Sequence, residues 1–365
     1  MAISVGNHTG RDLRFSVGEL TGALGDSVTV LPIVVALGTL TPVSLPHVLL
    51  LFGVFQIVWG VVYGLPLSVE PMKALAGLAI AGTISYPELA AAGLLAGGVL
   101  LVVGRGRLLA RVDRYVGTPV VRGVQLAVAL LLAQAGLELG LGDPLLAGVA
   151  VGATLLVVWF GYRRAATLVV LGFGGVLALA SAGVPSPSIP SLTLFPAGLP
   201  RLSPGAVEAS LGQLAMTVGN AAVATSVLCT DLFDRDVAAD DLASSMGAMS
   251  LLAVPLGGLP MCHGSGGLAG KYAFGARTGG ANLVLGGLYL GAALVAGLVV
   301  AFPMAVLGVL LVLVAVQLAR SATETTSLPL TVAVGVTGLV VNVGVAFVVG
   351  VAIHQFARRV LDRDL

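Results

Sequence analysis

The chain has 365 residues, of which 57% are hydrophobic and only 10% are charged, and its mean hydropathy is +1.06. An ordinary soluble domain is about one quarter charged, so this composition excludes one. The net charge of +1 gives no indication of a nucleic-acid partner.

Apolar runs of about 20 residues, long enough to cross a bilayer as a helix, recur along the whole chain. We therefore predict an all-α, multi-pass membrane protein with fourteen membrane segments, two of them half-length. The first seven are expected at residues 15–39, 45–63, 71–84, 86–104, 118–137, 144–161 and 165–183. The other seven are expected at residues 205–229, 242–258, 265–278, 281–301, 303–320, 327–341 and 342–357.

Residues 184–204, rich in proline and serine, are predicted to be an external linker between two repeats, 1–183 and 205–365. Seven spans per repeat give the second copy the opposite membrane orientation. Every arginine except Arg201 can then lie on one side, which predicts that both termini are cytoplasmic and that the protein lies in the cell (plasma or inner) membrane.

Two stretches containing glycine, proline and polar residues interrupt the apolar pattern at matching places. Gly64–Lys73 reappears 194 residues later as Gly258–Gly267. The same offset, without a gap, superimposes Glu19 on Gln213 and Asp26 on Asn220. Duplicated membrane proteins with matching helix breaks hold their substrate at those breaks, so the pattern predicts a carrier.

The residues at the two breaks indicate an anion as the cargo. Residues 64–69 suit a short extended segment, and Pro71 suits the first turn of a half-length helix. In the second copy, Ser265 is placed to cap the corresponding helix. The two N-termini are expected to meet, and their free N–H groups and helix dipoles would hold a small anion.

The two lysines of the chain both fall in these half-helices. Lys73 occupies a first turn, where its ammonium could face a bound oxyanion. Lys271 is expected to lie towards the cytoplasm, about two turns beyond the second break. For His263, a substrate contact and a hydrogen bond to local backbone are equally compatible with its position.

The first helix of each repeat carries polar groups on one face, because the members of each pair lie seven residues apart. These pairs are Glu19 with Asp26, which suggests a proton site, and Gln213 with Asn220, which are expected to hydrogen-bond the substrate. Ionisable groups inside a membrane are costly and usually functional. Glu70, beside the anion site, repels the cargo unless burial keeps it protonated. We therefore predict proton-coupled uptake, with Asp26, Glu19 and Glu70 as candidates; alternatively, Glu19 is solvated at the rim.

Several further polar residues are assigned simpler roles. Arg122 is grouped with the cytoplasmic arginines, and Gln56 and Gln125 are expected to bond neighbouring helices. The aspartate-rich stretch 231–241 is compatible with a metal-dependent intramembrane enzyme, but it contains Arg235 and has no second acidic cluster, so a solvated loop is favoured. Cys229 and Cys262 predict no disulfide.

Several motifs resemble the molybdate transporter branch of the sulfate permease superfamily. They are GALGDSVTVLPI at 22–33, VEPMKA at 69–74, PMCHGSGGLAG at 260–270 and FGAR at 274–277. The resemblance implies two inverted seven-segment repeats, with segments 1–4 and 8–11 as a core and 5–7 and 12–14 as a gate. It implies alternating access and an oxyanion between half-helices 3 and 10. The implied lining residues are Glu70, Pro71, Met72, Lys73, His263, Gly264, Ser265 and Gly266; members of the family carry glutamine where this chain has Glu70.

The sequence thus predicts a secondary transporter that takes up molybdate. Its partners would be the oxyanion, the lipid bilayer and, as a homodimer, a second copy, with no cofactor, metal or nucleic acid. Sulfate and tungstate remain open as cargo because tetrahedral dianions present similar hydrogen-bond patterns. A nucleobase carrier of the same fold and a membrane-embedded enzyme that uses residues 231–241 also remain open.

Overall fold

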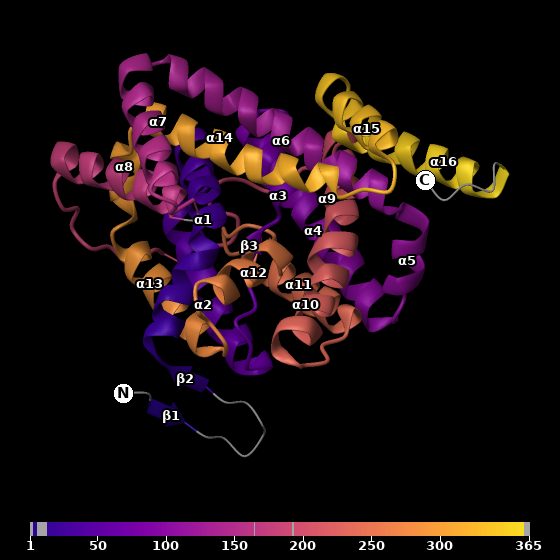
Figure 1. The fold of residues 1–365 in the computed structure, drawn as a ribbon, viewed down its shortest axis with the longest axis horizontal. Coiled ribbons are helices and arrows are strands. Elements are labelled where there is room, and N and C mark those ends of the chain that lie inside the picture. The colour runs from indigo at the N-terminus through magenta and orange to yellow at the C-terminus, as the bar shows by residue number, and fades with distance from the viewer. Residues whose placement is uncertain (1–2, 6–12, 164, 192, 361–365) are drawn as a thin grey trace.

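A computed structural model describes residues 3–5, 13–163, 165–191 and 193–360. The predicted cytoplasmic termini fall on residues 1–2 and 361–365, outside this range. Within it the chain is mostly helical (Figure 1). The first half contains β1 (Ile3–Val5), β2 (Leu13–Phe15), α1 (Val17–Leu40), α2 (Leu45–Tyr63), β3 (Glu70–Pro71), α3 (Lys73–Ile80), α4 (Tyr86–Arg105), α5 (Leu109–Val116), α6 (Thr118–Leu141), α7 (Pro144–Trp159) and α8 (Ala166–Ala182).

The second half begins with α9, which continues through a π-helical turn into α10. Its elements are α9 (Pro204–Met216), the π-helical turn (Thr217–Val223), α10 (Ala224–Phe233), α11 (Ala239–Ala253), β4 (Met261–Cys262), α12 (Ser265–Ala273), α13 (Gly280–Leu294), a 3-10 turn (Ala296–Ala301), α14 (Met304–Arg320), a second 3-10 turn (Ser321–Thr323), α15 (Leu328–Val340) and α16 (Val343–Val360).

Among the described residues, six helical stretches are long and apolar enough to cross a membrane. The protein is therefore a multi-pass membrane protein, as predicted. Each predicted segment coincides with a helix, although the ends differ by several residues. Three elements were not predicted: the antiparallel strands β1 and β2 and the short helix α5.

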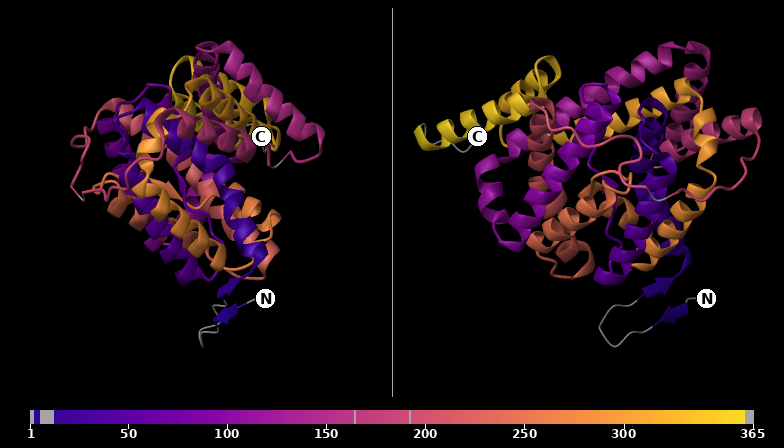
Figure 2. Two further views of the ribbon diagram at one scale, coloured as in Figure 1. Left: turned by 90° about the vertical axis from the view of Figure 1, so that its left-hand side faces the viewer. Right: turned by 180° about the vertical axis from the view of Figure 1, so that it is seen from behind.

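The helices pack mainly within two sets. In one set α2 packs on α13, α4 packs on α11, and α1 packs on α12 and α13. In the other, α6 packs on α14, α15 and α16, and α7 on α8 and α14. Figure 1 shows α6, α14 and α15 above and α2, α11, α12 and α13 below; the turned views in Figure 2 show the same separation. The division into core and gate and the inverted relation of the repeats remain predictions.

Glycine pairs bring the backbones of the main helix pairs close together. A Cβ atom on Gly53 of α2 would lie 2.8 Å from the carbonyl oxygen of Gly286 on α13. On Gly136 of α6 it would lie 2.6 Å from the oxygen of Gly308 on α14. Since real Cβ contacts are longer, only glycine permits these approaches. Each pair is therefore closely packed at these positions.

Candidate functional site

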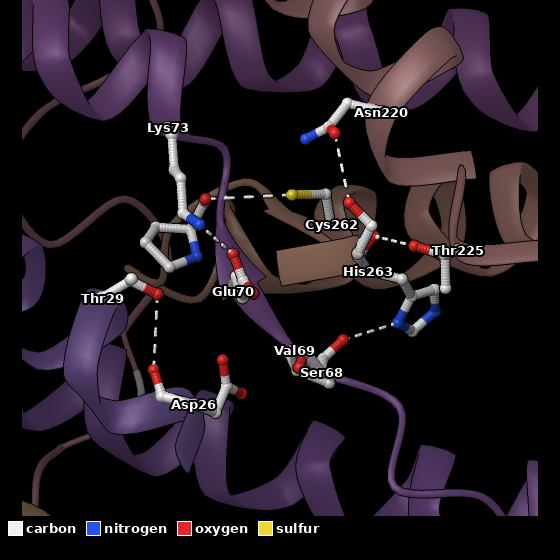
Figure 3. A network of polar contacts seen from close by, with 12 residues as sticks. Asp26, Thr29, Ser68, Val69, Glu70, Lys73, Asn220, Thr225, Cys262 and His263 are labelled. Carbon is white, nitrogen blue, oxygen red and sulfur yellow. Dashed lines mark hydrogen bonds and ion pairs between the residues drawn. The ribbon is translucent and has the colours of Figure 1, made fainter. Parts of the chain in front are cut away.

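The two predicted helix breaks meet inside the protein. Their extended segments pair as the antiparallel strands β3 and β4, with Glu70 opposite Cys262 and Pro71 opposite Met261. The N–H of Met72 also donates to the carbonyl of Pro260 at 2.9 Å. The half-length helices α3 and α12 begin immediately after the strands. The duplicated stretches therefore form one structure (Figure 3).

A cavity of about 740 Å³ lies against this strand pair. Seven of the predicted substrate-binding residues line it. They are Glu70, Lys73, Gln213, Asn220, Gly264, Ser265 and Gly266. Gly266 leaves its backbone open to the cavity, since a Cβ there would meet no atom within 4 Å.

An ion pair between one residue of β3 and one residue of α3 faces the cavity. Lys73 Nζ lies 2.5 Å from Glu70 Oε2, and the lysine side chain is 15% exposed whereas that of Glu70 is 1% exposed. Lys73 therefore presents the accessible charge of the pair. An oxyanion in the cavity would compete with Glu70 for this ammonium, because both supply oxygen acceptors.

Polar residues of α9 and of the π-helical turn form hydrogen bonds with the N-terminal ends of the half-helices. Gln213 Oε1 accepts hydrogen bonds from the N–H groups of Ala74 at 2.9 Å and Leu75 at 3.3 Å. These α3 donors, expected to be free for an anion, are thus occupied by a side chain. Ser265, which was expected to cap α12, is instead its first residue and caps no backbone N–H of the described residues; its Oγ donates to Asn220 Oδ1 at 3.1 Å. Asn220 lies in the π-helical turn, a deformation that often marks functional sites.

The extended segment that precedes β3 lacks the internal hydrogen bonds that a helix would give its backbone. Buried side chains donate to its carbonyl groups instead. Lys271 Nζ and Asn282 Nδ2 donate to the Leu67 carbonyl at 3.3 and 2.6 Å. Gln56 Nε2 donates to the Val69 carbonyl at 3.2 Å. Unpaired carbonyl groups are too costly in a membrane interior, so these polar residues permit the break.

The position of Lys271 contradicts the prediction that this residue lies towards the cytoplasm. Its side chain is fully buried, 3.4 Å from Asp26 Oδ2, and its ammonium also donates to Gln56 Oε1 at 3.1 Å and Asn282 Oδ1 at 2.8 Å. The sequence did not pair Lys271 with Asp26, because the two residues lie in different repeats. Desolvation is tolerated here because the ammonium has four oxygen partners, the Leu67 carbonyl among them.

His263, Pro71 and Met72, also predicted to contact substrate, lie behind the cavity rather than on its lining. The His263 ring is fully buried, with Nδ1 at 2.9 Å from the Ser68 carbonyl and Nε2 at 2.9 Å from Ser245 Oγ. The ring also packs edge-on against Trp59 and Tyr63. These contacts match neither of the two roles considered for His263, a hydrogen bond to local backbone or a substrate contact, because the backbone carbonyl that the ring contacts belongs to the other repeat.

Glu19 lies apart from the cavity, buried against the connection between α12 and α13. Its carboxylate accepts from the N–H groups of Arg277, Thr278 and Ala281 and from the Thr278 hydroxyl, at 2.9–3.1 Å. It is therefore not solvated at a rim, and its hydrogen bonds fix a loop.

We expect Glu19→Gln to destabilise the protein by about 1–3 kcal/mol, because an amide cannot accept all four hydrogen bonds. Thermal unfolding in detergent would measure the loss. A Glu19→Gln variant of normal stability would show that these hydrogen bonds contribute little to the fold.

The opposite wall of the cavity contains residues that the sequence did not assign to the site. Arg122 and Gln125 of α6 and Glu324, which follows α14, line it. Arg122 donates to Gln125 Oε1 at 2.9 Å and pairs with Glu324 at 3.2 Å. Gln125 thus bonds within its own helix rather than to a neighbouring one. Only the position of Arg122 near the start of a predicted span could have suggested this site.

Comparison with known proteins identifies a family model and several relatives that match this chain. The family model described as "Molybdate transporter of MFS superfamily" matches residues 18–132 and 205–318. Molybdate transporter 1 of Arabidopsis thaliana is 32% identical over 85% of this chain and 81% of its own. Molybdate transporter 1 of Chlamydomonas reinhardtii is 29% identical over 91% of this chain and 89% of its own.

Solved structures of transporters share the fold. The transmembrane domain of the cyanobacterium bicarbonate transporter BicA has a TM-score of 0.65 at 19% identity, covering 92% of this chain and 97% of its own. SLC26A9 has a TM-score of 0.70 at 14% identity, covering 93% of this chain and 64% of its own.

Proposed function

Because the chain belongs to the molybdate transporter family, we propose that it is a secondary transporter that takes up molybdate together with protons. The observation that carries the proposal is the cavity at the paired helix breaks, with the Lys73 ammonium on its wall. The relatives are transporters, which favours a carrier over an enzyme using residues 231–241.

In this proposal the cargo binds between a core and a gate. The core contains α1–α4 and α9–α13 and carries the strand pair, and the gate contains α6–α8 and α14–α16. The cavity is lined by both sets, so movement of one against the other would expose it to either side in turn. The residues that form or support the site are Glu70, Pro71, Met72, Lys73, His263, Gly264, Ser265, Gly266, Gln213 and Asn220.

The orientation follows from the arginine distribution. Arg122 and Glu324, near the ends of α6 and α14, lie on the side assigned to the cytoplasm. We therefore assign an inward-open conformation, with both termini in the cytoplasm and the protein in the cell membrane. Association into a homodimer belongs to the same proposal, and cross-linking in native membranes tests it.

Uptake into proteoliposomes tests the function directly. Labelled molybdate should accumulate inside, faster when the outside is acidified, because a proton is expected to accompany the anion. Excess tungstate and sulfate should compete, whereas uracil should not. Uptake that ignores the pH gradient would contradict the proton coupling, and competition by uracil alone would favour a nucleobase carrier.

Glu70→Gln should retain molybdate binding but lose the stimulation by an inward proton gradient, because the amide resembles a carboxyl group that is always protonated. Glu138→Gln is the matched control, since this carboxylate is exposed on α6 and bonds only Gln134 in the described structure. Coupling that survives in Glu70→Gln would place the proton elsewhere.

A further inference from the structure

Three buried oxygen atoms behind the cavity have no hydrogen-bond partner among the described residues. They are Asp26 Oδ1, Ser68 Oγ and Glu70 Oε1. The side chains that carry them are 0–1% exposed. Such groups are normally paired, because an unpaired buried polar atom keeps its full desolvation cost. Because three such atoms lie together, we expect a single feature to provide their missing hydrogen bonds.

The three atoms converge on Gly267 of α12. The position that a Cβ atom would take on this glycine overlaps all three of them, and they are its three nearest atoms. The oxygens are therefore neighbours of one another, although they come from α1, from β3 and from the segment before β3. Figure 3 shows Asp26 and Ser68 below Glu70, which itself belongs to the strand pair.

The second oxygen of each carboxylate is already occupied. Glu70 Oε2 pairs with Lys73, and Asp26 Oδ2 pairs with Lys271 and accepts from Gln56. The two inner oxygens thus lie close together, with the Ser68 hydroxyl beside them. Two ionised carboxylates in this arrangement repel each other strongly, and a single proton replaces the repulsion with a short hydrogen bond.

We propose that Asp26 and Glu70 form a carboxyl pair that holds one shared proton, with the Ser68 hydroxyl donating to the pair. The inference deepens the proposed function, on which it rests for the identity of the anion. It locates the coupled proton between two residues of different elements, rather than on any one of the three candidate carboxylates.

The charges around the pair connect the proton to the anion. Asp26, Glu70, Lys73 and Lys271 together carry no net charge without the proton and one positive charge with it. The protonated cluster therefore attracts a dianion to Lys73. A bound oxyanion in turn draws Lys73 away from Glu70, which then holds the proton more tightly. Since such coupling is reciprocal, anion and proton favour each other's binding.

Three more titratable groups face the pair: the Cys262 thiol on β4, the His263 ring after it and the Tyr289 hydroxyl on α13. None adds a fixed charge between the two inner oxygens. The His263 nitrogens are bonded to Ser68 and Ser245. A sodium ion would also use oxygen ligands, but three oxygens are fewer than the six or so that hard cations such as Ca²⁺ and Mg²⁺ take. We therefore assign a proton.

Infrared spectroscopy of the purified protein, without any anion, tests the proposal. At neutral pH the wild type should show a carbonyl band of a protonated carboxyl group that shifts in D₂O. Both Asp26→Asn and Glu70→Gln should lose it, because the remaining carboxylate then pairs with its own lysine. Glu138→Gln should keep it. Ser68→Ala should keep the band at a shifted frequency, which tests the pair without altering either carboxylate.

Loss of the band in only one of the two carboxylate variants would assign the proton to that residue alone and overturn the proposal. Absence of the band from the wild type would also overturn it, as would loss of the band on adding Na⁺ alone. Because no anion is present, these results do not depend on the cargo. If molybdate proved not to be transported, the proposed function would fail while a positive infrared result would stand.

Discussion

Replacing Lys271 with methionine is expected to lower the free energy of unfolding by about 3–5 kcal/mol. Methionine fills much of the same volume but leaves Asp26 Oδ2 without its cationic partner in a fully buried site. It also removes the donor that Gln56, Asn282 and the Leu67 carbonyl share. Denaturation in mixed detergent micelles, followed by helical circular dichroism, measures the loss.

Two further variants make this test specific. The double variant Asp26→Asn with Lys271→Met should recover part of the loss, because the carboxyl group that has lost its partner is removed as well. Arg201→Met is the control: its side chain is 72% exposed and lies 3.7 Å from Glu88, so the change should cost less than about 1 kcal/mol. A Lys271→Met protein as stable as the wild type would show that the buried pair contributes little to the fold.

Replacing Lys73 with alanine is expected to reduce uptake of molybdate at low concentration by about a hundredfold. A hydrogen bond between charged groups contributes about 1.5–3 kcal/mol, and every 1.4 kcal/mol is about a factor of ten in affinity. The variant also leaves Glu70 unpaired against the cavity, where it repels the anion. Uptake into proteoliposomes over a range of molybdate concentrations measures the effect.

Lys73→Arg should retain most of the activity because it keeps the positive charge at the same place. The double variant Lys73→Ala with Glu70→Gln should transport better than Lys73→Ala alone, since the repelling carboxylate is gone. If Lys73→Ala retained normal affinity, the anion site would have to lie away from the start of α3.

The helix breaks were the part of the fold that could best be predicted from the sequence. The repeated stretches 64–73 and 258–267 combine glycine and proline with polar residues inside apolar runs, and each signal is local. The structure pairs them as β3 and β4. By contrast, α5 has only eight residues, of mixed polarity, so its local pattern was too short to identify a helix.

Most of the buried polar network could not be predicted, because it depends on contacts between distant segments. Lys271 meets Asp26 and Gln56 only after α1, α2 and α12 have packed together. Arg122 was grouped with the other cytoplasmic arginines, and only the packing of α6 against the end of α14 places it, together with Glu324, on the cavity wall. The sequence identified Lys73 and Glu70 because they flank the break itself.

The β3–β4 pairing links the starts of both half-helices through main-chain hydrogen bonds. We expect this part of the site to travel as one rigid piece, presenting identical ligands to the cargo on either side of the bilayer. If the dissociation constant of the anion differs between the two sides of the membrane, the difference would then come from the opposite wall of the cavity, where Arg122 and Gln125 lie. The difference in affinity between the two sides would then depend on that wall, whereas selectivity among anions would depend on the part of the site around β3 and β4.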